Sequence, residues 1–79
     1  MTEFRAYEEF IDFIAAGPSS EHVATFQPSE ATRRRVVDLL AREKGAGLSA
    51  EESEELDDYI RLEHVMRLAK ARARRLLTP

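Results

Sequence analysis

The chain has 79 residues, of which 43% are hydrophobic and 34% charged, with a formal net charge of -3 and no cysteine. Such a length supports one small domain, and the missing cysteines exclude disulfides and thiolate metal sites. The acidic balance disfavours bulk attraction to nucleic acid. No stretch approaches the roughly 18 apolar residues of a membrane helix, and MTEFRAYEEF lacks the pattern of a secretion signal, so we expect a cytoplasmic protein with no membrane partner.

The stretch EFRAYEEFIDFIAAGP predicts a first helix over about residues 3–16. Apolar side chains at spacings of three and four predict its buried face, which consists of Phe4, Tyr7, Ile11 and Ile14 and is widened by Phe10 and Phe13. Gly17 followed by Pro18 predicts its end, because glycine accepts the left-handed conformation after a helix and proline cannot continue the hydrogen-bond ladder. Four of the six aromatic residues belong to this helix, so we expect its surface to be covered by a packing partner.

A connector and a middle helix follow. Ser19 or Ser20 is placed to cap a single helical turn over residues 21–25, and Ser29 is placed to cap a second helix over about residues 30–44, which GAG then ends. The consecutive Arg33, Arg34 and Arg35 fan around this helix at about 100° per residue, so they form no single stripe.

A long third helix is predicted over about residues 50–77. Ser49 and Glu52 match the capping box, and no glycine or proline interrupts the run before Pro79. Spacings of three and four define a narrow coiled-coil-like seam of Tyr59, Leu62, Met66, Ala69, Ala73 and Leu76. The small Ala69 and Ala73 would let a partner helix approach closely. The fold class is therefore all-α: a helical hairpin or antiparallel bundle of these helices in one domain over 1–79, completed by self-association.

Charge is ordered along the third helix. Residues 51–58 contain six acids and no base, whereas residues 67–75 contain five bases and no acid. Both blocks complement the helix dipole, which accounts for them in an ordinary solvated helix. The same order favours antiparallel pairing, because a parallel copy would oppose like charges. Whether the seam is satisfied within one chain or between two chains stays open.

Catalytic and metal-binding motifs are missing from the sequence. His22 and His64 lack partners at metal-ligand spacing, and the serines are placed as helix caps. We therefore expect no enzymatic activity, no metal and no cofactor.

The leading hypothesis is a non-enzymatic module that binds a protein partner or a second copy of itself, as a homodimer or larger oligomer. Its interface candidates are Phe4, Tyr7, Phe10, Tyr59, Leu62, Met66 and Leu76, oriented by the basic residues Arg67, Lys70, Arg72, Arg74 and Arg75. A second hypothesis is a nucleic-acid-binding accessory or transcriptional factor, in which Arg33, Arg34 and Arg35 join those bases in one composite patch. A third is an enzyme whose site is completed by a partner.

Two segments, FIDFIAAGPSSEHVATFQPSE and GAGLSAEESEELDDYIRLEHVMRLAKARA, resemble a group of small bacterial helical proteins of uncertain function. The resemblance runs from about Phe10 to Ala73 and includes an aromatic first helix, a Gly-Pro break and a long last helix. Members often lie beside nuclease-like genes, which implies an antitoxin-like or accessory role. The resemblance makes the following residues candidates for partner recognition: Leu62, Glu63, His64, Leu68, Lys70, Ala71, Arg72 and Ala73.

Overall fold

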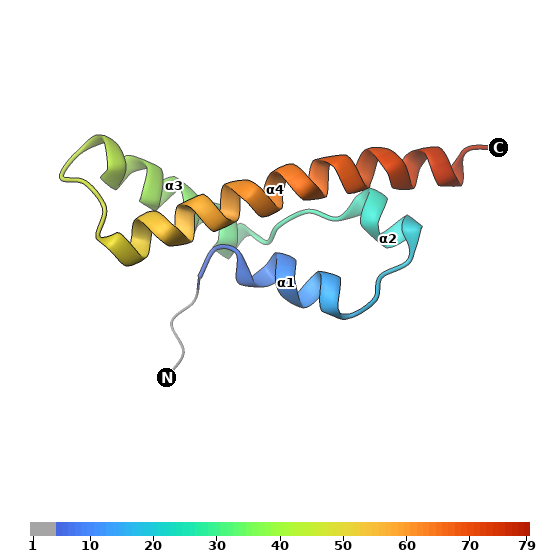
Figure 1. The fold of residues 1–79 in the computed structure, drawn as a ribbon, viewed down its shortest axis with the longest axis horizontal. Helices are drawn as coiled ribbons and strands as arrows, with labels where there is room; N and C mark the ends of the chain where they lie inside the picture. The colour runs from blue at the N-terminus through green and yellow to red at the C-terminus, as the bar shows by residue number, and fades with distance from the viewer. Residues whose placement is uncertain (1–4) are drawn as a thin grey trace.

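The computed structural model describes residues 5–79, and Phe4, an expected interface residue, lies outside them. The described residues form four helices and no strand: α1 (Glu8–Ala15), α2 (Ser20–Thr25), α3 (Glu30–Lys44) and α4 (Ala50–Leu77) (Figure 1). The all-helical class and the long C-terminal helix are therefore confirmed. Within this part of the chain, no helix is both long enough and apolar enough to span a membrane.

α4 begins at the predicted capping box. The Ser49 hydroxyl accepts a hydrogen bond from the Glu52 backbone N–H, and the Ser49 N–H donates to the Glu52 carboxylate, both at 3.1 Å. These bonds satisfy two of the amide groups that a helix start leaves unpaired. At 1.5 Å per residue, the 28 residues of α4 span about 42 Å, so this helix is the axis of the molecule.

α1 is shorter than the predicted 3–16. Residues 5–7 precede it, and the backbone amides of Arg5 and Ala6 are paired with side chains. The Arg5 N–H donates to Glu8 at 3.0 Å and the Ala6 N–H to Glu55 at 2.8 Å, so the chain gains no hydrogen bond by starting the helix earlier. At the other end, Gly17 adopts a φ of 67°, the left-handed conformation that the Gly-Pro break predicts.

Ser19 and Ser29 accept hydrogen bonds from the backbone N–H groups three residues ahead and so cap α2 and α3. α2 is the short turn expected in the connector. The Ser29 N–H also donates to the Glu9 carboxylate at 2.6 Å, which ties the start of α3 to α1.

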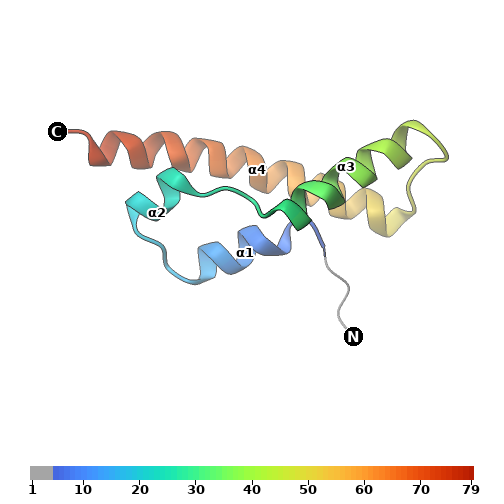
Figure 2. The same cartoon turned by 180° about the vertical axis from the view of Figure 1, so that it is seen from behind.

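α1 and α2 lie on the same side of α4 in both views, whereas α3 lies beside its N-terminal half (Figures 1 and 2). α2 is the helix whose backbone approaches α4 most closely. The small Ala73 of α4 is buried and Ala69 is half-buried.

The core among the described residues is small. Its buried apolar side chains are Ala6, Phe10, Leu39, Leu56, Met66 and Ala73. The predicted buried face of the first helix is wrong in one respect: Ile11 and Ile14 are each 47% exposed, and Phe10 points into the core in their place. Because the real helix turns Phe10 toward Tyr59 of α4, the two isoleucines lie at the edge of the contact.

The molecule is elongated. Its Cα radius of gyration is 14.3 Å, against about 12 Å for a compact domain of this length, and its extents are 50 × 28 × 19 Å. The elongation comes from α4, whose C-terminal turns reach past the other helices (Figure 1). Large aliphatic side chains consequently remain at the surface, including Leu68 at 60% and Leu76 at 69% exposure.

Candidate functional site

Four aromatic rings from three segments of the chain form a continuous cluster beneath α4. The ring centroids of Phe13 and Phe26 lie 4.3 Å apart, those of Phe26 and Phe10 5.6 Å, and those of Phe10 and Tyr59 5.3 Å, all in tilted arrangements. Such geometry is favourable for aromatic pairs beyond the area they bury. Burial raises the pKa of the Tyr59 hydroxyl above its ordinary value. The cluster holds α1 and the segment after α2 against α4.

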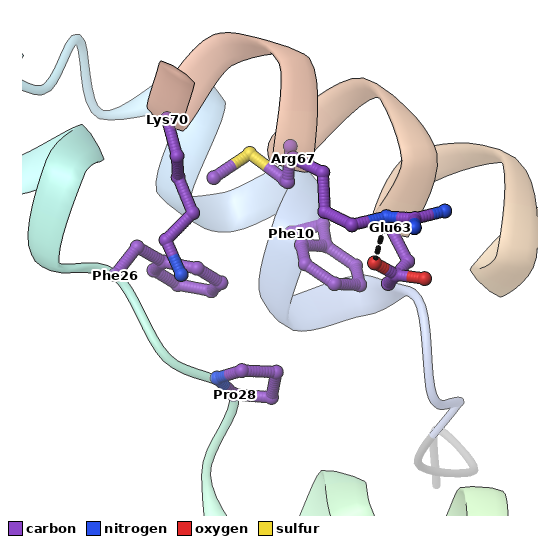
Figure 3. A pocket seen from close by; sticks show the side chains of 7 residues that line it. Phe10, Phe26, Pro28, Glu63, Arg67 and Lys70 are labelled. Carbon is purple, nitrogen blue, oxygen red and sulfur yellow. Dashed lines mark ion pairs between the residues drawn. The ribbon is translucent and has the colours of Figure 1, made fainter. Parts of the chain in front are cut away.

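A hollow of about 80 Å³ opens beside this cluster. Its lining residues are Phe10, Phe26, Pro28, Glu63, Met66, Arg67 and Lys70. Figure 3 shows that the side chains of Phe10, Phe26, Pro28 and Lys70 converge on it. Since a cavity of about 150 Å³ holds a benzene ring, this hollow has room for a small aliphatic group. Its floor is apolar, and its charged groups lie at the rim.

The rim has an excess of positive charge. Arg67 pairs with Glu63 at 2.7 Å (Figure 3), whereas Lys70 has no ion pair among the described residues. One turn further along α4, the exposed Arg74 also has no ion pair in this part of the chain. Leu77 follows on the same side and is 52% exposed. We call the hollow together with Lys70, Arg74 and Leu77 the hollow face.

A second charged cluster joins α3 to α4. The Glu55 side chain is 5% exposed and accepts hydrogen bonds from Arg35 Nε at 2.9 Å, Arg35 Nη2 at 2.8 Å and the Ala6 N–H at 2.8 Å. The guanidinium hydrogen bonds are the main reason that the pKa of Glu55 lies below its ordinary value. Glu55 therefore stays ionised although it is buried, and it connects three segments of the chain.

This cluster continues toward the loop between α3 and α4. Asp38 lies 3.9 Å from Arg35 and 2.5 Å from Arg42, and Arg42 also pairs with Glu52 of the capping box. The hydrogen bond from Arg42 lowers the pKa of Asp38. The polar groups here bind one another, so this cluster holds the two helices together and offers no unpaired group to a ligand.

The structure divides the expected interface residues into two sets. Phe10 is 2% and Met66 4% exposed, so both belong to the core, and each presents only a small part of its surface, to the hollow. Tyr7, Tyr59 and Leu62 are half-buried, and Leu76 is exposed. The expected seam is largely covered within the chain, which is one of the two alternatives that the sequence left open.

The three consecutive arginines of α3 are each bonded to another side chain. Arg35 is committed to Glu55, while Arg34 pairs with Glu30 at 2.7 Å and Arg33 bonds Gln27 at 3.0 Å. Position 55 lies about 25 Å along the helix axis from position 72, given 1.5 Å per residue. Arg35 is therefore not available to the composite patch with the bases of residues 67–75, and the patch stays a prediction for Arg33 and Arg34.

Two functional features were missed from the sequence. Pro28 and Phe26 line the hollow although both were interpreted only as connector residues. The sequence FQP could have indicated them, because its aromatic side chain is held in an extended segment just before a helix cap. The sequence also assigned no role to the outward side of α4, where Ile60 is 52% and Val65 50% exposed.

Within residues 5–79, no group of three or more histidine, aspartate or glutamate side chains is arranged so that it could hold a metal ion. The comparisons with known proteins give no relative: no family model, no curated protein and no solved structure matches the chain.

Proposed function

We propose that this chain is a non-enzymatic helical protein-interaction module with an antitoxin-like or accessory role, and that its partner protein binds the hollow face. The observation that carries the proposal is the combination of an apolar hollow with Lys70 and Arg74, two cations that have no ion pair among the described residues. Apolar anchors in a pocket supply affinity in protein interfaces, and the surrounding charges select and orient the partner.

The chemistry of the hollow face defines the partner segment. An aliphatic side chain of the partner enters the hollow between Phe10 and Phe26, and carboxylates beside it pair with Lys70 and Arg74. An amphipathic helix with acidic residues one turn apart meets both requirements, because positions three or four apart lie on one helix face. The exposed Leu77 extends the apolar contact beyond the hollow.

The nucleic-acid hypothesis is not supported to the same degree. Its composite patch depended on Arg33, Arg34 and Arg35, and these side chains are bonded to Gln27, Glu30 and Glu55. The acidic first half of α4 would meet phosphates repulsively.

The test is quantitative co-purification from the source cell with the tagged full chain. The informative variant is Lys70→Glu/Arg74→Glu, and the matched control is Arg72→Glu/Arg75→Glu, which makes the same change in net charge on the other side of α4. We expect one protein to be captured by the wild type and by the control and lost with the hollow-face variant.

The captured protein is then purified and its affinity measured by calorimetry. We expect the hollow-face variant to bind roughly tenfold more weakly or worse, because two charge contacts become repulsive. Capture of no protein, or equal binding by both variants, refutes the proposal. Catalytic activity that appears only on mixing the two proteins would establish the partner-completed enzyme in its place.

A further inference from the structure

A second surface lies on the opposite side of α4. The outer face is the side of α4 turned away from α1 and α2, which both views leave uncovered along its C-terminal half (Figures 1 and 2). It consists of Glu54, Asp57, Arg61, His64, Val65, Leu68, Arg72 and Arg75, and every one of these residues is exposed. At about 100° per residue, Arg72 and Arg75 point away from Lys70 and Arg74 by roughly 100° to 160°, so the outer face and the hollow face are separate surfaces.

The charges of the outer face have a symmetric order. Glu54 and Asp57 lie at one end, Arg72 and Arg75 lie at the other, and none of the four has an ion pair within residues 5–79. Between these ends the face carries Arg61 and His64 beside two apolar side chains, Val65 at 50% and Leu68 at 60% exposure. Ile60, 52% exposed, lies along its edge. The outer face therefore runs along α4 from an acidic end through a mixed centre to a basic end.

We infer that the outer face binds a second copy of this chain in antiparallel orientation. A two-fold axis beside residues 64 and 65 places Glu54 opposite Arg75 of the second copy and Asp57 opposite its Arg72. Because the axis repeats each contact, four acid–base pairs flank a centre in which Val65 lies opposite His64 of the second copy and Leu68 lies opposite its Arg61. A contact from residue 54 to residue 75 is about 32 Å long.

The second copy fits this surface better than another protein does, because the outer face is its own complement. A two-fold interface requires the same patch on both chains to be self-complementary, which the acidic end and the basic end of the outer face satisfy. Parallel copies would place acid against acid and base against base. This inference goes beyond the proposed function, since it concerns the outer face, and each can fail without the other.

The first test is the solution mass of the full chain by light scattering across a micromolar concentration series. We expect a dimer at low salt that dissociates more readily at about 1 M salt, where the Debye length falls to about 3 Å. Arg72→Glu/Arg75→Glu makes all four cross-chain pairs repulsive and should raise the dissociation constant roughly tenfold or more. Lys70→Glu/Arg74→Glu is the matched control and should stay dimeric.

A charge-exchange variant distinguishes lost charge complementarity from any other damage that the Arg72→Glu/Arg75→Glu variant causes. Glu54→Arg/Asp57→Arg/Arg72→Glu/Arg75→Glu restores complementarity between antiparallel copies and should recover the dimer, although it opposes the helix dipole. Circular dichroism of each variant checks that α4 remains helical. A wild-type monomer at all concentrations, equal dissociation of both double variants, or no recovery by the exchange overturns the inference.

Orientation is tested by single cysteines, because the natural chain has none. Val65→Cys lies beside the two-fold axis and should form a disulfide-linked dimer under mild oxidation, since a disulfide needs Cα atoms within about 7 Å. Glu54→Cys should not link to itself but should link to Arg75→Cys when the two variants are mixed. Efficient self-linking of Glu54→Cys would mean parallel copies and would overturn the inference.

Discussion

The ion pair between Arg35 and Glu55 gives the sharpest stability prediction. Replacing Arg35 with methionine keeps most of its length but removes two hydrogen bonds, of 2.9 and 2.8 Å, from a carboxylate that is 5% exposed. Breaking one side of a buried pair costs about 3–5 kcal/mol. The Arg35 side chain is 25% exposed and the pair borders solvent. We therefore expect Arg35→Met to lower the free energy of unfolding by about 2–3 kcal/mol. For a domain of this size, that lowers Tm by roughly 10–20 °C.

The assay is urea unfolding followed by circular dichroism, with Arg34→Met as the matched control. Arg34 pairs with Glu30 at the surface, where both side chains are at least 75% exposed, so its loss should change the free energy of unfolding by less than about 0.5 kcal/mol. The double variant Arg35→Met/Glu55→Gln removes the buried charge and keeps an acceptor for the Ala6 N–H, so it should recover most of the lost stability. Equal effects of Arg35→Met and Arg34→Met would refute the reasoning.

The same pair predicts a pH dependence. The folded-state pKa of Glu55 lies below the ordinary value of 4.5, chiefly because Arg35 donates hydrogen bonds to it. A lowered carboxyl pKa contributes stability that is present above about pH 4.5 and is lost as the pH falls through the folded value. The difference in unfolding free energy between wild type and Arg35→Met should therefore be largest near neutral pH and shrink in acid. A constant difference down to acid unfolding would contradict this assignment.

Three further substitutions test the local structure by thermal unfolding. Phe10→Ala should lower the free energy of unfolding by about 3–5 kcal/mol, because the ring is 2% exposed and contacts both Phe26 and Tyr59. A loss below about 1 kcal/mol would mean that the aromatic cluster is not the core. Gly17→Ala should lower the free energy of unfolding by about 1 kcal/mol because of its φ of 67° alone, since no atom lies within 4 Å of the added methyl group. An unchanged free energy of unfolding would contradict the left-handed turn. Ser49→Ala should lower the free energy of unfolding by about 1 kcal/mol and shorten α4 at its start. Faster hydrogen exchange of the amides in the first turn would show the shortening, and unchanged exchange rates would exclude the cap.

Local signals in the sequence predicted the helices well. Ser29 and Ser49 start α3 and α4 at the positions where short polar side chains can bond the free amides, and Gly17 takes the left-handed turn. Such features depend on residues within one turn of each other, so they can be found without knowing the fold. The start of α1 was placed too early because its amides are satisfied by Glu8 and, from another helix, by Glu55.

Features that join distant segments were not predictable in the same way. Arg35 is one of three consecutive arginines, and only the register of α3 beside α4 selects it for Glu55, twenty positions later. Likewise, Met66 was recognised as apolar, but the sequence did not say that Phe10 and Pro28 would flank it. The sequence therefore left open whether the seam is covered within one chain or by a second one, because periodicity identifies an apolar face without identifying what covers it.

The aromatic cluster also constrains the order in which contacts can form as this protein folds. Phe10 and Phe26 belong to the first third of the chain, whereas Tyr59, which completes the cluster, lies 49 positions after Phe10. During synthesis the early aromatic side chains emerge before the helix that shelters them, and contacts over so long a separation form slowly. Until α4 is made, that exposed aromatic segment is available to other proteins. A small helical protein with this arrangement depends on its last helix for protection as well as for stability.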